Sequence, residues 1–161
     1  MAAKDILLEQ HTACYDENEW FVAVKNAVAG LTAEQANWKP NGADNTIWEE
    51  VNHITFWNER WLQRYRGELN APQDVENKGT FKSDEADWQA TCEKLFAVMD
   101  EWREKLNEIT DEKLNSQVND QYTAPWYSPL AQQNIHNAYH TGQIVLLRKL
   151  QGSWDSAKGV S

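Results

Sequence analysis

Two histidines four residues apart are the feature of the sequence most able to do chemistry. His136 and His140 lie in NIHNAYHTGQIVLLRKL, a segment with helical apolar spacing that carries Leu147 and Leu150 along or beside the same face. Residues four apart share one side of a helix, so both imidazoles are expected to point inward. Burying a polar ring without a partner costs on the order of 1–3 kcal/mol. A divalent metal would bind one nitrogen of each ring, which makes this spacing a good two-point ligand.

Taken alone, the histidine pair is also compatible with a packing role and with a protease motif. Both rings could be core or cleft histidines that hydrogen-bond to polar neighbours. The spacing matches the helix motif of zinc proteases, but Asn137 stands where that motif has its catalytic glutamate. A peptidase therefore loses its main support, and the metal and packing interpretations stay open.

His53, in IWEEVNHITFWNERWL, is the candidate for a third ligand. It lies off the centre of the apolar stripe of its helix, so simple solvent exposure is an alternative. Its depth favours a shared site, because it is seven residues beyond Thr46, while His136 and His140 are seven and eleven beyond Pro129. With a rise of about 1.5 Å per residue, three such residues on antiparallel helices lie at one level.

Four helical segments are expected to position these histidines. They span residues 4–29, 46–66, 84–108 and 129–150, and no segment shows the period-two alternation of a strand. The patterns TAEQ from Thr32 and TIWE from Thr46 are capping boxes, which predict a short helical turn and the start of the second long helix. These features predict an all-α four-helix bundle. The long connection at 67–82 permits a crossover that makes the second and third helices parallel.

Length and composition set broad limits. The 161 residues favour a single domain over residues 1–152, followed by a loosely held tail at 153–161. The net charge of −10 would repel nucleic acid and anionic membranes, so neither is expected as a partner. The sequence has no apolar run that would span a bilayer and no signal-peptide pattern, and we expect a cytoplasmic protein.

Other residue types give weaker signals. Cys14 and Cys92 have no metal or redox spacing and are expected to be buried thiols. His11 falls opposite the apolar stripe of the first helix, so we expect it on the surface. The nine tryptophans either fill the core or wall a pocket, and their number alone does not separate these roles.

Three stretches resemble the DinB/YfiT-like family of four-helix-bundle metalloproteins, the DinB superfamily. They are LTAEQANWKPNGADNTIWEEVNHITFWNERWL, TAPWYSPLAQQ and NIHNAYHTGQIVLLRKL. The resemblance implies an up-down-down-up bundle with a long crossover between helices two and three. It also implies a metal on three histidines, one from the second helix and two from the fourth, at positions that match His53, His136 and His140.

The resemblance further implies a function. Three histidines leave one position of a zinc ion open, as in catalytic sites, and zinc or nickel is expected, with manganese as an alternative. Relatives use low-molecular-weight thiols such as bacillithiol or mycothiol, so a thiol and a small-molecule electrophile are the expected partners. Metal-dependent hydrolysis and a non-catalytic metal- or ligand-binding module remain alternatives, and a homodimer is left open.

Further residues are candidates for the pocket around the metal. Glu17, on the inward stripe of the first helix, and Glu50 are candidate general bases, although a solvated edge position is the favoured explanation for Glu17. Trp57, four residues after His53, would wall the pocket or simply pack. Gln143 lies along the face of the two C-terminal histidines.

Overall fold

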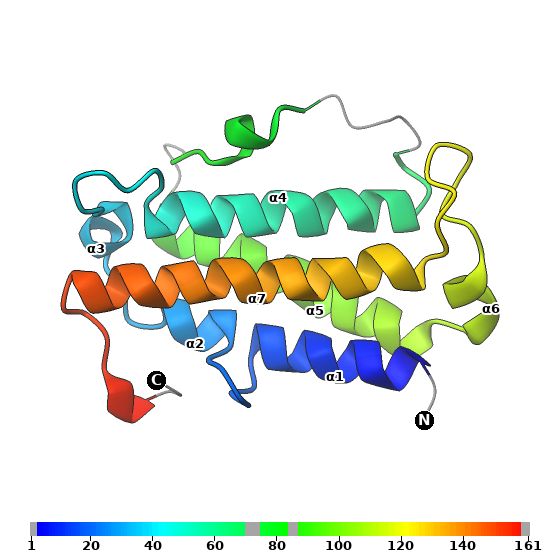
Figure 1. Ribbon diagram of the computed structural model, residues 1–161, viewed down its shortest axis with the longest axis horizontal. Helices are drawn as coiled ribbons and strands as arrows, with labels where there is room; N and C mark the ends of the chain where they lie inside the picture. Colours follow the sequence, from blue (N-terminus) through cyan, green and yellow to red (C-terminus); the bar gives the residue numbers. More distant parts are fainter. Residues whose placement is uncertain (1–2, 70–74, 84–86, 159–161) are drawn as a thin grey trace.

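The computed structural model describes residues 3–69, 75–83 and 87–158, and these residues are helical with no strand. The predicted all-α class is therefore confirmed. The helices, in chain order, are α1 (Ala3–Tyr15), α2 (Val24–Val28), α3 (Ala33–Asn37), α4 (Ile47–Tyr65), η1 (Asn77–Thr80), α5 (Trp88–Glu108), α6 (Asp111–Asn115), α7 (Tyr127–Leu150) and η2 (Ser156–Lys158). Four of them, α1, α4, α5 and α7, are long and lie side by side (Figure 1).

The directions of α4 and α5 follow from the contacts between them. Near their N-terminal ends, the rings of Trp48 and Trp88 lie 5.4 Å apart. Toward the C-terminal ends, Arg66 pairs with Glu101 at 2.6 Å. Residues early in α4 contact residues early in α5, and residues late in α4 contact residues late in α5. The two helices therefore run in the same direction. Both begin at the end of the molecule where α3 lies, and α7 ends there (Figure 1).

The expected N-terminal caps are present. The hydroxyl of Thr46 accepts from the backbone of Glu49, whose carboxylate accepts from the backbone N–H of Thr46, and Thr32 and Gln35 make the same reciprocal pair. Each cap satisfies backbone donors that the first turn leaves free. The cap at Thr46 fixes where α4 begins and therefore the level at which His53 projects.

The expected first helix over residues 4–29 is wrong, because α1 ends at Tyr15 and a separate short helix, α2, begins at Val24. The side chain of Asn18 accepts a hydrogen bond from the backbone of Ala23 at 3.0 Å and another from Asn26 at 2.9 Å. This asparagine offers the backbone an alternative to the helical ladder, so the chain turns instead of continuing.

The other boundaries differ less from expectation. Residues 84–86, where the third helix was expected to begin, lie outside the described residues, and α5 starts at Trp88 with Asp87 as its cap. The fourth helix begins at Tyr127, two residues before the expected Pro129, a shift within the usual fraying of helix ends. At the C-terminus, Arg148 donates to the carbonyl of Ser153 at 2.8 Å, which holds the start of the expected loose tail.

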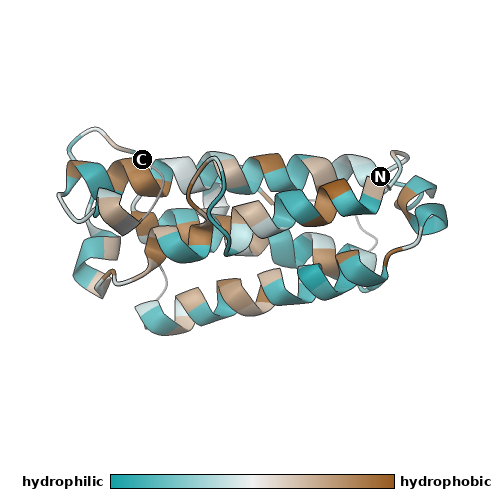
Figure 2. Ribbon diagram, turned by 90° about the horizontal axis from the view of Figure 1, so that it is seen from below, coloured by the Kyte–Doolittle hydropathy of each residue, from teal (hydrophilic) through white to brown (hydrophobic). Residues whose placement is uncertain are grey.

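The core fills the space between the long helices. Each helix carries both apolar and polar residues along its length (Figure 2). Tryptophans serve both expected roles, since Trp102 and Trp126 are buried in the core whereas Trp57 and Trp61 line a cavity. Within the described residues, no helix combines the length and apolar character needed to cross a membrane.

Candidate metal centre

Helices α4 and α7 bring His53, His136 and His140 together. Each ring offers one nitrogen, and these three atoms lie within 4.8 Å of one another. Nε2 of His53 and Nε2 of His136 lie 3.0 Å apart. His53 and His140 are buried, and His136 is partly exposed. Because α4 and α7 are antiparallel, three positions distant in sequence meet at one level of the bundle.

Thr80 and Phe81 orient His53 from the long connection between α4 and α5. Nδ1 of His53 lies 2.6 Å from the hydroxyl of Thr80. That hydroxyl donates its own proton to the carbonyl of Asn77 at 2.7 Å, so it accepts from Nδ1–H of the imidazole. The ring of Phe81 stacks on His53 with 3.9 Å between centroids. Nε2 of His53 is therefore left with its lone pair directed toward the other histidines.

Glu50 has the same orienting role for His140. Nδ1 of His140 lies 2.6 Å from Oε2 of Glu50, a carboxylate only 2 % exposed. Asn45 donates to the other carboxylate oxygen at 3.2 Å. With its amide nitrogen turned toward Glu50, Gln143 donates to both oxygens at 3.1 and 2.9 Å and accepts from the hydroxyl of Tyr139 at 3.0 Å. The engaged carboxylate lies behind His140, where it anchors the ring.

The three rings fit a divalent transition metal. With metal–nitrogen bonds of about 2.0–2.1 Å, tetrahedral ligand atoms lie about 3.3 Å apart. The 3.0 Å between the nitrogens of His53 and His136 is close to this separation, and all three nitrogens lie within 4.8 Å of one another. Burial, followed by the neighbouring imidazoles, lowers the pKa of His53 to about 3, and the same causes lower the pKa of His136 to about 4. Both rings are therefore neutral near neutral pH, which is the form that binds metals.

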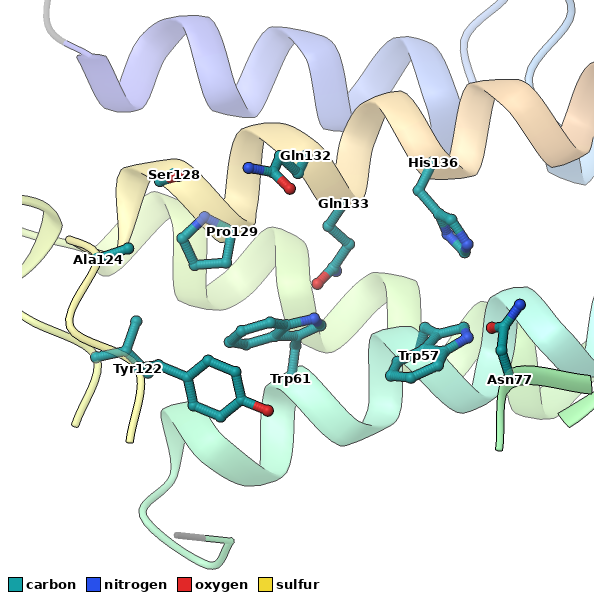
Figure 3. Close-up of a pocket in the computed structure, with 11 residues that line it drawn as sticks. Trp57, Trp61, Asn77, Tyr122, Ala124, Ser128, Pro129, Gln132, Gln133 and His136 are labelled. Atoms are coloured by element: carbon teal, nitrogen blue, oxygen red, sulfur yellow. The ribbon is translucent and has the colours of Figure 1, made fainter. Parts of the chain in front are cut away.

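A cavity of about 490 Å³ lies between α4 and α7 and reaches His136. It is lined by uncharged side chains, with aromatic rings from α4 and from the loop before α7 (Figure 3). Six of the residues that line it are Trp57, Trp61, Tyr122, Pro129, Gln133 and His136. The cluster thus has one partly exposed histidine that faces a space large enough for a small organic molecule.

Of the three other residues expected in the pocket, one lines the cavity and two do not. Trp57 lines the cavity that reaches His136. Gln143 contacts Glu50 and is not among the residues that line the cavity. Glu17 follows the end of α1 and is exposed, so its expected place on an inward helical stripe is wrong. Thr80 and Phe81 were missed because they lie in a connection without helical periodicity.

Two further expectations concern buried groups away from the cluster. His11, expected on the surface, is 1 % exposed, and its Nε2 donates to the carbonyl of Met99 at 2.9 Å. Cys14 is buried as expected and donates to the carbonyl of Asn134 at 3.2 Å. Burial raises the pKa of the Cys14 thiol to about 12, which keeps it protonated and unreactive.

Comparison with known families agrees with this geometry. A family model described as the DinB superfamily matches residues 17–144, a span that includes all three histidines of the cluster. Comparisons with curated proteins and with solved structures gave no significant match. The match covers most of the chain, and the protein therefore belongs to the DinB superfamily.

Proposed function

We propose that this protein is a metal-dependent enzyme that activates a low-molecular-weight thiol of the bacillithiol type and transfers it to an organic electrophile. The metal would be held by His53, His136 and His140, with zinc or nickel favoured and manganese as the alternative. The observation that carries the proposal is the convergence of three histidine nitrogens within 4.8 Å at one end of an uncharged cavity.

The residues around the cluster suit this role. A divalent metal bound there would supply a Lewis acid that lowers the pKa of a thiol and favours the nucleophilic thiolate. Thr80 and Glu50 hold two of the rings in the orientation that ligation requires. The aromatic wall beside His136 would hold an apolar electrophile next to the cluster and exclude water from it.

Hydrolysis has less support from the positions of the carboxylates. Both oxygens of Glu50 are engaged on the far side of His140, and Glu17 is exposed on the loop after α1. Neither carboxylate has a position from which it would activate a water molecule beside His136. A thiol that loses its proton through a lowered pKa has less need of such a base.

The test is a turnover assay on the zinc- or nickel-loaded protein with a panel of thiols and electrophiles. Loss of the electrophile should require both metal and thiol, and it should disappear in His136→Ala while the circular dichroism of the helices is kept. Ile135→Ala, at an exposed neighbour of His136 that does not line the cavity, should retain activity. Metal-dependent cleavage of an ester without thiol would establish the hydrolase instead, and no reaction across the panel would favour a binding module.

We also propose that the long helices form the up-down-down-up bundle typical of the superfamily, with the connection between α4 and α5 as its crossover. The contacts of Trp48 with Trp88 and of Arg66 with Glu101 support parallel α4 and α5. The contacts of Glu50 with His140 and of His53 with His136 support antiparallel α4 and α7. Such a topology would bring the histidines to one level.

A further inference from the structure

The cavity beside the cluster is an elongated groove along α7. Its lining on that helix runs from Ser128 to His136, a span of eight residue steps that corresponds to about 12 Å. His136, Trp57 and Asn77 lie at one end, and Tyr122 and Ala124 lie toward the other (Figure 3). A groove of this length and a volume of about 490 Å³ accommodates a molecule with two fused rings rather than a single small group.

The chemistry of the groove excludes charged ligands. Although the chain has a net charge of −10, the residues that line this cavity include no Asp, Glu, Lys or Arg. Trp57, Trp61 and Tyr122 supply flat apolar surface instead. Away from the end where the metal would bind, a carboxylate or ammonium group would lose its hydration without gaining a partner of opposite charge among the lining residues. The groove therefore favours a neutral, flat and mainly apolar occupant.

Gln133 adds one specific polar feature. Its side chain is only 7 % exposed, it lines the groove, and its amide points from α7 toward Trp61 on α4 (Figure 3). Its Nε2 donates to Oδ1 of Asn58 at 2.6 Å. Its Oε1 is buried and has no hydrogen-bond partner.

Hydrogen bonds around Asn58 fix this orientation of the Gln133 amide. Nδ2 of Asn58 donates to the carbonyl of Ile54 at 2.8 Å and to Oδ1 of Asn137 at 2.8 Å. Oδ1 of Asn58 must therefore accept, and it takes hydrogen bonds from Asn137 at 3.1 Å and from Gln133. If the Gln133 amide were turned over, two oxygens would face each other. The network thus holds a buried acceptor in the groove one helical turn from His136.

We propose that the groove binds the electrophilic substrate of the transferase, and that this substrate is a neutral, flat, mainly apolar molecule with an N–H or O–H group that donates to Oε1 of Gln133. This inference rests on the proposed function for the identity of the reaction. The binding preference itself depends only on the groove. Since Gln133 precedes His136 by three residues, the donor lies about 4–5 Å along the helix axis from the end where the cluster is.

Three naphthalene probes that differ in one substituent test the preference. The affinities of 2-naphthol, 2-methoxynaphthalene and 2-naphthoate would be measured by calorimetry on the zinc-loaded full chain. The hydroxyl should make 2-naphthol bind about fivefold more tightly than the methyl ether, which has no donor. After removal of the metal, so that no cation attracts it, the carboxylate should bind at least about tenfold more weakly than 2-naphthol. Equal affinities for the first two probes, or no binding by either, would overturn the proposal.

A matched pair of variants assigns the preference to Gln133. Gln133→Met keeps the length of the side chain but removes its acceptor, so the ratio of the first two affinities should fall to about one. Gln132→Met makes the same change at an exposed position of the lining, and it should keep the wild-type ratio. A Gln133→Met protein with normal helicity and an unchanged ratio would overturn the assignment.

If Gln133→Met does not fold, Ala124→Trp provides the second test. Ala124 is exposed at the far end of the groove, so a large ring there shortens the space with little demand on the core. It should weaken binding of 2-naphthol at least about threefold, because part of the apolar contact is lost. Unchanged binding would place the probe outside the groove and reject the proposal.

The proposed function and this inference fail in different ways. After removal of the metal with a chelator, the preference for 2-naphthol should persist, because Gln133 and not the metal binds the hydroxyl. Disappearance of the preference on chelation would assign the hydroxyl to the metal and overturn the inference. If the preference and its dependence on Gln133 hold while no thiol-dependent turnover is found, the groove stands and the transferase does not.

Discussion

At the scale of single residues, the candidate site depends on side chains that hold the histidines as much as on the histidines themselves. Thr80 and Glu50 accept from Nδ1 of His53 and His140, so the Nε2 atoms of both rings face the cluster. An imidazole whose outer N–H is fixed in this way has its ligating tautomer selected before a metal binds. The loss of either acceptor should therefore weaken metal binding without removing a ligand.

Thr80→Val tests the support of His53. Valine has the shape of threonine without the hydroxyl, so His53 would lose the acceptor for its Nδ1–H. We expect zinc affinity, measured by competition with a chromophoric chelator, to fall about 10–100-fold. Thr55→Val is the control, because Thr55 is buried on α4 and its hydroxyl donates to the carbonyl of Val51 on the same helix. Equal losses in both variants would contradict a specific role for Thr80.

His11 should make stability depend on pH. Burial is the main reason that the pKa of this imidazole falls from 6.5 to about 4 in the folded chain. The unfolded chain therefore binds more protons between these values, and stability falls as the pH drops from about 6.5 toward 4. The difference between the two pKa values corresponds to a decrease of about 3 kcal/mol in the free energy of unfolding.

Urea unfolding of the metal-free protein across this pH range measures the effect. His53 and His136 also have lowered pKa values, so the comparison with His11→Leu isolates one residue. The variant should be less stable at neutral pH, because it loses the hydrogen bond to Met99. Its free energy of unfolding should also depend less steeply on pH, by the equivalent of about one proton. Parallel pH profiles would show that His11 does not titrate in this way.

At the scale of elements, the helix caps and the apolar faces of the long helices could be predicted from the sequence, but the turns could not. TIWE and the apolar spacing of α5 identify helices because caps and core contacts act over a few residues. The surface placement of His11 was wrong because the expected helix over residues 4–29 continues past Tyr15, where α1 ends, so its apolar stripe combined residues from separate elements. Once α1 ends at Tyr15, its buried positions are Leu7, His11, Cys14 and Tyr15, a regular helical face.

The candidate site also contains some residues that the sequence could predict and others that it could not. Sequence could give the three histidines, since two share a helix face and the third lies at a matching depth. The roles of Thr80, Phe81 and Gln133 could not be predicted from the sequence, because they arise from contacts between segments far apart in the chain. No local periodicity marks a loop residue that packs on a helix from outside.

Thr46→Ala tests the element that sets the level of His53. Removal of the capping hydroxyl leaves a backbone donor of the first turn of α4 without its partner. We expect the free energy of unfolding, from urea denaturation, to fall by about 1 kcal/mol. Thr46→Ser retains the hydroxyl and should lose much less. A full loss in the serine variant would show that the methyl group, and not the cap, carries the effect.

At the scale of the whole molecule, the order and direction of the helices create the site. Zero-length cross-linking of carboxylates to amines tests the parallel pair, because Glu59 on α4 lies 3.0 Å from Lys94 on α5. The expected product joins these two residues, and Glu59→Gln should abolish it. A cross-link from Glu49, in the first turn of α4, to Lys105, in the last turn of α5, would instead indicate an antiparallel arrangement and reject the proposed topology.

The central claim, that three histidines from α4 and α7 form one metal site, is tested most directly by equilibrium dialysis against zinc and against nickel. The wild-type chain should retain one metal ion with at least one of these metals. His53→Ala, His136→Ala and His140→Ala should each lose it, whereas His11→Gln should retain it. Retention near zero in the wild-type chain, or retention unchanged in His140→Ala, would contradict the three-histidine site.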